Sequence, residues 1–314
     1  MFFCLVMALQ VKGFGWLRDY NDPRDYAIDH PKVNKILTSK GTKKHHVLKA
    51  SDLPSNVDNR KWCSPIEDQG QLGSCTANAG VGMYEYMENK ANGTYTDGSR
   101  LFLYKATRLL MGDQGIGDSG AWIRTTLGAI RLFGIPNEVY WPYSDAPDKF
   151  DIMPEAWLWA FGQNFQSIAY FRLDTSADGN ENIKSIKQYV NNGYAVDYGF
   201  TVFQSYTQSN TNGGIFPFPA SSGGRISERT VGGHSVLIVG YDDKKVAKNT
   251  KDGNTKTGCF LIRNSWGTSW GDHGYGWFPY EYFLTSYNGD TLADDAWAIT
   301  SEEWVDTEVF NPPT

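Results

Sequence analysis

Three residues far apart in the chain have the types needed for a thiol nucleophile, its base and the group that orients the base. Cys75 closes the stretch "DQGQLGSC", where Gly73 and Ser74 permit a tight turn that leaves the sulfur exposed at the predicted start of a helix. A helix N-terminus favours the thiolate through its free N–H groups and its dipole. His234 enters an apolar strand directly after two glycines, and Asn264 offers an amide oxygen that can hold an imidazole N–H. This pattern indicates nucleophilic catalysis in a cleft.

Taken alone, Cys75 has other interpretations, namely a buried apolar residue, half of a disulfide or a metal ligand. The chain has four cysteines, of which Cys4 lies in an apolar N-terminal block. Cys63, Cys75 and Cys259 lie 12 and 184 residues apart. These spacings match no zinc site, so we expect no metal. Three is an odd number, which leaves one thiol unpaired in an exported protein.

The composition argues against several classes of function. The chain has 314 residues and a net charge of -6, which gives no basic surface for nucleic acid. We find no apolar run long enough to cross a bilayer. The length fits one large domain or two smaller ones. We therefore expect a globular monomer that needs no cofactor.

The N-terminal block "MFFCLVMALQ" resembles the apolar part of an export signal, although it is short and lacks a basic start. Residues 1–10 are interpreted as a signal remnant, with a retained structural segment as the alternative. The first interpretation predicts a secreted or periplasmic protein, or a lysosome-like compartment in a eukaryote. Residues 11–52 are polar and rich in turns, which predicts an extension laid over a domain, with a disordered tail as the alternative.

Apolar periodicity predicts helices over residues 75–90, 99–111 and 121–134. After about residue 165 the pattern changes to short strands, at 194–200, 234–242, 259–266 and 275–280, with a charged hairpin loop at 244–258. Helices followed by strands indicate an α+β fold in two lobes with a cleft between them. The helical lobe would cover about 70–165 and the strand-rich lobe about 166–314.

Four blocks of the sequence, taken in order, resemble the papain-like cysteine peptidases: "DQGQLGSC", "GDSGAW…GIPNEVYWPY", "GGHSVLIVGY" and "IRNSWGTSWGDHGYG". The resemblance implies a papain-like domain over 53–314, with a helical lobe and a β-barrel-like lobe. It makes Cys75 the nucleophile, through a covalent thioester, and His234 the base and later the acid. Asn264 would orient His234. Gln69 would donate its side-chain amide to the oxyanion, beside the backbone N–H of Cys75.

The same resemblance implies the substrate-binding residues, which are Ser119, Gly120, Trp122, Gly233, Ser235 and Trp266. Gly120 matches a glycine that binds the substrate backbone, and Ser119 replaces a second glycine. Trp122 would shorten the pocket for the second side chain before the scissile bond. Trp266 would cover the bond between the histidine and the asparagine. Leu72 stands where the family has a disulfide cysteine, which leaves only Cys63 and Cys259 to pair with each other.

The few cysteines and the short leader resemble the bacterial xylellain-like group. This likeness implies that residues 11–52 form a propeptide that crosses the cleft and inhibits its own enzyme. Its removal is expected within "TSKGTKKHHVLKAS". The implied function is a secreted cysteine endopeptidase, made as a zymogen, that acts on peptides or proteins. Two alternatives remain open: a papain-fold binding protein whose cleft stays blocked, and an acyltransferase that uses the same three residues.

Overall fold

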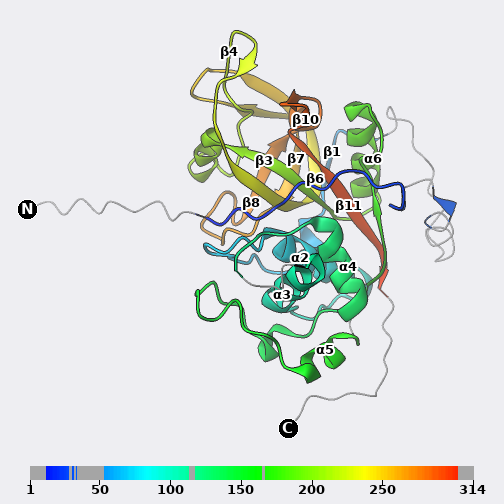
Figure 1. Ribbon diagram of the computed structural model, residues 1–314. Coiled ribbons are helices and arrows are strands. Elements are labelled where there is room, and N and C mark those ends of the chain that lie inside the picture. The colour runs from blue at the N-terminus through cyan, green and yellow to red at the C-terminus, as the bar shows by residue number, and fades with distance from the viewer. Residues whose placement is uncertain are drawn as a thin grey trace, which may run out of the picture.

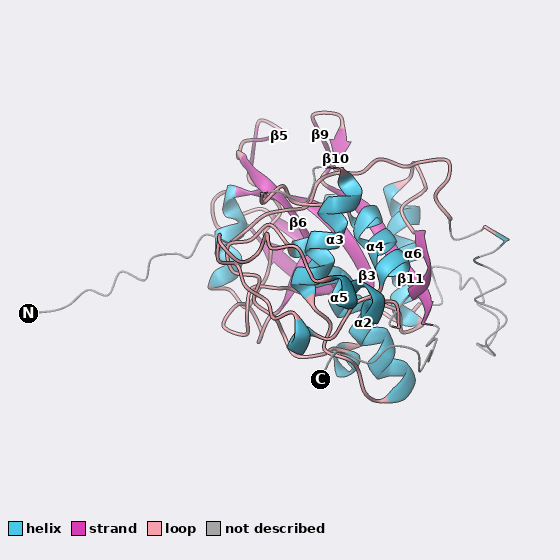
Figure 2. Cartoon of the chain, turned by 60° about the horizontal axis from the view of Figure 1, so that its bottom comes forward, coloured by secondary structure: helices cyan, strands magenta, loops and turns pink. Residues whose placement is uncertain are grey.

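The computed structural model describes residues 12–27, 30–31, 33, 53–112, 117–164 and 167–302. The signal-like block at 1–10, most of the chain between 28 and 52 and the expected cleavage stretch lie outside these residues. Figure 1 shows helices α2 to α5 gathered below the strands of the main sheet, and in the turned view of Figure 2 the same helices lie in front of these strands. This arrangement confirms the predicted α+β class with two lobes.

The helical lobe is built around α2 (Cys75–Asn92), which is buried over most of its length. Helices α3 (Arg100–Met111) and α4 (Ile123–Phe133) pack against α2, and the short α5 (Ala156–Gly162) contacts α4. Ser99 caps α3 by accepting from the backbone N–H of Phe102. Gly93 ends α2 in a left-handed conformation, which costs glycine little. No helix among the described residues is long and apolar enough to span a membrane.

The strand-rich lobe contains a seven-stranded antiparallel sheet in the order β2, β11, β3, β6, β7, β8, with β1 paired to β6. The strands are β1 (Asn56–Asp58), β2 (Ser167–Arg172), β3 (Val196–Phe203), β6 (Thr230–Lys248), β7 (Thr255–Arg263), β8 (Tyr275–Pro279) and β11 (Ala293–Glu302). Two small hairpins lie outside this sheet: β4 (Ser221–Ser222) with β5 (Arg225–Ile226), and β9 (Ser286–Tyr287) with β10 (Asp290–Thr291). Leu237 on β6 pairs with Arg263 at the end of β7, so residues 234 and 264 lie at the same end of the sheet.

The elements differ from the sequence prediction in several places. The segment predicted as a charged loop at 244–258 is mostly strand, because β6 continues through Lys248 and β7 begins at Thr255. Helix α6 (Gly179–Asn191) lies in the half predicted to be strands. Asp178 caps it by accepting from the backbone N–H of Asn180, a start signal that was present in the sequence. A further difference is small, since α2 continues two residues beyond Lys90.

A buried acid on α2 helps to hold the two lobes together. Glu85 accepts from the Ser64 hydroxyl at 2.5 Å and from the backbone N–H of Gly98 at 2.9 Å. Arg263, at the end of β7, donates to the same Ser64 oxygen at 3.0 Å. Burial raises the pKa of Glu85 to about 7, and the charge of Arg263 opposes that rise. The acid is therefore protonated more readily in the folded chain than in the unfolded one.

This pKa shift predicts how the stability of the protein depends on pH. The folded chain keeps the Glu85 proton at pH values where the unfolded chain has lost it, so the stabilisation is present at acid pH and is lost as the pH rises through about 7. Glu85→Gln, which cannot lose a proton, should flatten the fall in melting temperature between about pH 5 and about pH 8. The matched control is Glu181→Gln on α6, where the carboxylate is exposed and pairs with Lys184. Equal slopes for the three proteins would contradict this account.

Candidate active site

Cys75 is the first residue of α2, as the sequence predicts, but its sulfur is not exposed. The residue is 0% exposed, because residues 13–16 of the N-terminal segment lie over it. We call residues 12–27 the leader segment. Burial raises the pKa of the Cys75 thiol to about 12, although backbone N–H groups of Ser235, Gly15 and Thr76 lower it in part. In this state the thiol holds its proton at neutral pH.

His234 is held by two neighbours from the loop that follows β7. Asn264 Oδ1 lies 2.9 Å from the ring Nε2 of His234. The indole of Trp266 stacks on the imidazole, with ring centroids 4.7 Å apart and planes inclined by 24°. The other ring nitrogen, Nδ1, has no hydrogen-bond partner within the described part of the chain. Burial lowers the pKa of His234 to about 4, and the bond to Asn264 opposes that shift.

Gln69 lies in the loop before Cys75 and is fixed by the loop after Asn264. Its backbone N–H donates to the carbonyl oxygen of Ser265 at 2.9 Å, and the Ser265 hydroxyl donates to Gln69 Oε1 at 2.6 Å. The side-chain Nε2 is thereby turned toward the leader segment. It donates to the carbonyl oxygens of Leu72 at 2.8 Å and Gly13 at 3.1 Å. The amide expected to bind an oxyanion thus already holds a peptide carbonyl.

The leader segment passes between the two lobes. Figure 1 shows it as a narrow blue ribbon that crosses the main sheet above the helices. Ala121 donates its backbone N–H to Gly15 O at 2.7 Å and accepts from Leu17 N at 3.0 Å. On the other lobe, Gly233 O accepts from Trp16 N at 3.0 Å. The segment therefore forms backbone hydrogen bonds with both walls of the cleft.

The close fit of this segment depends on glycine. A Cβ atom on Gly15 would lie 1.7 Å from the carbonyl oxygen of Gly73, and one on Gly13 would lie 2.3 Å from that of Leu72. Real Cβ atoms do not come so close to a backbone oxygen, so any larger residue at position 15 must displace the segment.

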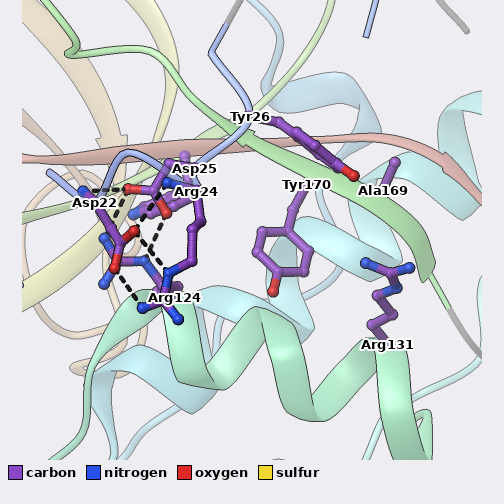
Figure 3. Close-up of a pocket in the computed structure, with 9 residues that line it drawn as sticks. Asp22, Arg24, Asp25, Tyr26, Arg124, Arg131, Ala169 and Tyr170 are labelled. Carbon is purple, nitrogen blue, oxygen red and sulfur yellow. Dashed lines mark hydrogen bonds and ion pairs between the residues drawn. The ribbon is translucent and has the colours of Figure 1, made fainter. Parts of the chain in front are cut away.

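Ion pairs anchor the leader segment on either side of the cleft. Lys12 contacts Asp68 at 2.7 Å, and Arg124 on α4 contacts Asp25 at 2.7 Å. Arg18 pairs with Asp294. Figure 3 shows Arg124 beside the leader acids, at the edge of a cavity of about 390 Å³ between the leader, α4 and β2. This cavity contains none of the predicted site residues, so it is a consequence of how the leader docks and not the catalytic cleft.

Two tyrosines of the helical lobe position the loop that precedes Cys75. The Tyr143 hydroxyl donates to Gln69 O at 2.9 Å and lies 2.6 Å from the Ser74 hydroxyl. The Tyr104 hydroxyl on α3 donates to Asp118 Oδ1 at 2.6 Å and accepts from the backbone N–H of Gly120 at 3.0 Å. The Asp118 carboxylate also accepts from the backbone N–H of Gly73 at 3.0 Å. These bonds connect the nucleophile loop to the segment that holds the leader.

The remaining predicted substrate-binding residues lie around the same cleft. Gly233 binds the leader backbone, and the Ser235 hydroxyl donates to the buried Asp197 at 2.5 Å. The exposed Ser119 hydroxyl contacts the carbonyl oxygen of Gly120, its neighbour. The N–H of Gly120 is taken by Tyr104, so Ala121 supplies the backbone bonds instead.

Trp122 caps the start of α4 and is half-buried, and its effect on a specificity pocket stays a prediction.

The expected bridge between Cys63 and Cys259 is absent, because both residues are free thiols. Cys63 lies beside Arg263 and Tyr275, which pair with each other across β7 and β8. Cys259 is four residues from Arg263 along β7, a distance of roughly 13 Å at the usual rise of a strand. A disulfide needs Cα atoms within about 7 Å, and the surroundings of Cys63 at Arg263 and Tyr275 agree with the two thiols being unpaired.

Comparisons with known proteins agree with this geometry. The sequence profile of the papain family cysteine proteases matches residues 53–282. An uncharacterised peptidase C1-like protein of Acanthamoeba polyphaga mimivirus is 34% identical over 295 residues, which span 92% of this chain and 86% of the viral protein. Human cathepsin L2 is 28% identical over 226 residues, 71% of this chain and 60% of the cathepsin.

A solved structure gives the same result for the fold. The crystal structure of xylellain, a cysteine protease from Xylella fastidiosa, superposes with a TM-score of 0.68 and 29% identity, and covers 94% of this chain and 98% of xylellain. The family profile covers well over half of the chain, and its match includes Cys75, His234 and Asn264. The chain therefore belongs to the papain family of cysteine proteases.

Proposed function

We propose that this protein is a cysteine endopeptidase made as a latent precursor, with Cys75 as nucleophile, His234 as acid and base, and Asn264 as the residue that orients the imidazole. The bond between His234 Nε2 and Asn264 leaves Nδ1 free to exchange a proton. Such a nucleophile, base and orienting group favour catalysis over a purely binding role. Peptides and proteins are the substrates of this family, and endopeptidase action on them is the proposed reaction.

The residues account for each proton in the reaction. His234 Nδ1 takes the thiol proton, and the thiolate attacks the peptide carbonyl carbon. The carbonyl oxygen then carries a negative charge, which the Gln69 side-chain N–H and the Cys75 backbone N–H stabilise. The C–N bond breaks as His234 returns the proton to the leaving amine, which leaves a thioester. Water then attacks the thioester, with His234 taking a proton from the water and returning it to the sulfur.

One observation carries this proposal, namely the peptide carbonyl of Gly13 on the Gln69 amide at 3.1 Å. The Gln69 amide also donates to the carbonyl oxygen of Leu72, so its position does not depend on the leader. A carbonyl group from an extended peptide therefore binds where the mechanism needs a carbonyl oxygen to develop charge. Backbone bonds from Ala121 and Gly233 hold the same peptide on both walls of the cleft.

The leader would keep the enzyme latent for two physical reasons. It presents the N–H of Gly15, not a carbonyl carbon, to the sulfur of Cys75. It also excludes water, and this burial moves the pKa of the thiol up to about 12 and that of the imidazole down to about 4. Both groups are then neutral over the physiological range, so the thiolate form is scarce. A tethered segment needs only weak contacts to achieve this, because its effective concentration at the cleft is high.

The first prediction tests the nucleophile and the oxyanion donor. Cys75→Ala should abolish peptide hydrolysis by the processed enzyme, and Gln69→Ala should lower kcat by roughly 10²–10³, the usual loss for one oxyanion donor. Gln71→Ala is the matched control, because this glutamine is exposed two residues further along the same loop. Steady-state hydrolysis of a peptide aminocoumarin measures all three. Retained activity in Cys75→Ala would refute the assignment.

The second prediction tests latency in the full chain. Gly15→Ala places a Cβ atom where the carbonyl oxygen of Gly73 lies, so the leader should leave the cleft and peptide hydrolysis should rise at least tenfold over the unprocessed wild type. Tyr20→Ala is the control, since the Tyr20 side chain is exposed and its hydroxyl makes a long hydrogen bond to Asp290, while the bond from Arg124 goes to the backbone oxygen, which the substitution keeps. If Gly15→Ala and wild type are equally active before any cleavage, the leader does not inhibit.

The third prediction concerns the link between the nucleophile loop and the substrate-binding segment. Tyr104→Phe removes the bonds to Gly120 and to Asp118, so KM for peptides should rise and kcat/KM should fall at least roughly tenfold, since one buried hydrogen bond alone has about that effect. Asp118→Ala frees Gly73 instead and should lower kcat. Tyr86→Phe is the control, because its buried hydroxyl bonds to Gly193 O, outside the cleft. If these side chains had only a structural role, all three variants would lower the melting temperature to a similar extent, and none would change KM and kcat separately.

A further inference from the structure

Trp16 of the leader fills a pocket beside the catalytic residues. It is 5% exposed and packs within the apolar core of the helical lobe. Its backbone is held by Gly233 on one side, and it lies opposite Ala121 in a parallel β-bridge on the other. A substrate side chain placed at this point of the cleft would enter the same pocket.

Two glycines make the wall of this pocket flat. A Cβ atom on Gly199, in β3, would lie 1.9 Å from Cε2 of the Trp16 indole, and one on Gly233, in β6, would lie 2.7 Å from Cε3. Neither glycine has the positive φ angle that would require glycine for its backbone. Their role here is to leave space, and the space has the shape of a planar ring.

Asp295 forms the polar end of the pocket. Its side-chain Oδ2 accepts from the indole Nε1 of Trp16 at 3.0 Å, and within the described residues this is the only hydrogen bond to that oxygen. The other oxygen, Oδ1, accepts from Trp297 Nε1 at 2.7 Å. Asp295 is 0% exposed while the leader is in place, because Trp16 covers the carboxyl group. Once the leader is removed, Oδ2 faces the emptied pocket, where the N–H of a substrate side chain can replace that of Trp16.

The backbone around Asp295 is built to present this carboxyl group. Asp295 has φ of 60°, an unfavourable value for a residue other than glycine. It lies where β11 bulges against β3, between the pairs Asp294 with Gly199 and Trp297 with Asp197. The carboxylate of Asp174 accepts the backbone N–H groups of Asp295 at 2.7 Å and Ala296 at 3.0 Å, which holds the bulge in place. Bulges commonly redirect a side chain near a functional site.

We infer that the pocket filled by Trp16 is the main side-chain pocket for substrates and that Asp295 selects a planar aromatic side chain with an N–H donor, tryptophan above phenylalanine or leucine. This inference rests on the proposed peptidase function. The inferred pocket differs from the short apolar pocket that the sequence predicts from Trp122. Gly199 and Gly233 leave space for a large ring, and Asp295 adds a hydrogen-bond acceptor. The leader thus mimics the side chain that the enzyme prefers.

The first experiment uses the full chain and does not depend on hydrolysis. The rate at which an epoxide thiol probe labels Cys75 reports how often the leader leaves the cleft. Trp16→Phe keeps a ring but loses the N–H, and should raise this rate roughly tenfold. In an Asp295→Asn background the same substitution should have a much smaller effect, because the acceptor is already weakened. Equal effects in both backgrounds would overturn the inference.

The second experiment uses the processed enzyme and a set of peptide aminocoumarins that differ only in the second residue before the cleaved bond. The wild type should favour tryptophan over phenylalanine by roughly tenfold in kcat/KM, and Asp295→Asn should bring this ratio close to one. Asp290→Asn is the charge-matched control, because Asp290 contacts the leader but not the pocket. A wild-type ratio near one would overturn the inference.

A third variant guards against misfolding of Asp295→Asn. Gly199→Ala adds one methyl group to the pocket wall. It should reduce cleavage of the substrate with tryptophan at the second residue before the cleaved bond at least tenfold, while cleavage of the substrate with valine there changes little. An equal loss for both substrates would contradict the proposed pocket. If the proposed peptidase function is wrong, the probe labels Cys75 but no peptide is cleaved. The labelling rates of Trp16→Phe in the two backgrounds then still test the pocket, because they do not depend on hydrolysis.

Discussion

The structure depends on the contact between two loops, one before Cys75 and one after Asn264. Gln69 N donates to Ser265 O at 2.9 Å, and the Ser265 hydroxyl holds the Gln69 amide at 2.6 Å. Cys75 begins a helix of one lobe, whereas His234 lies on a strand of the other, so only such contacts between lobes fix the distance between nucleophile and base. The pairing of Glu67 O with Gly267 N continues the same contact. Weakening it would move Gln69 and Cys75, the proposed oxyanion donor and nucleophile, together and away from His234.

The leader uses the cleft that this contact creates. It is held by backbone bonds to both lobes and by ion pairs at its two ends, and glycines at positions 13 and 15 allow it to lie directly over the nucleophile. The same burial that hides Cys75 also keeps its thiol protonated and His234 neutral. The covering of Cys75 and the neutral state of Cys75 and His234 therefore have one physical cause, which is the removal of water from these two side chains. On the proposed function, a substrate must displace the leader before the two groups can ionise.

Much of the site could be predicted from sequence because its chemistry depends on residue type in short blocks. The local patterns predict Cys75 at a helix start and a strand that carries His234, although β6 begins four residues before His234, at Thr230. What escaped prediction depends on tertiary contacts: the covering of Cys75, the use of Ala121 in place of Gly120 and the buried Asp295 have no local signal. The prediction of a disulfide between Cys63 and Cys259 was wrong, because it rested on the exclusion of the other cysteines, and two remaining cysteines need not be neighbours in the fold. Helix α6 had a capping signal at Asp178 that the strand pattern around it concealed.

The most direct test of the central claim is to trap the covalent intermediate. The full chain and its processed form would each be mixed with an activated peptide ester, quenched in acid within milliseconds to seconds, and mapped by mass spectrometry. The account predicts that the acyl group is found on Cys75, only in molecules that have lost residues 12–27, and on neither Cys63 nor Cys259. An acyl group on another residue, or equal acylation of Cys75 while the leader is still attached, would contradict it.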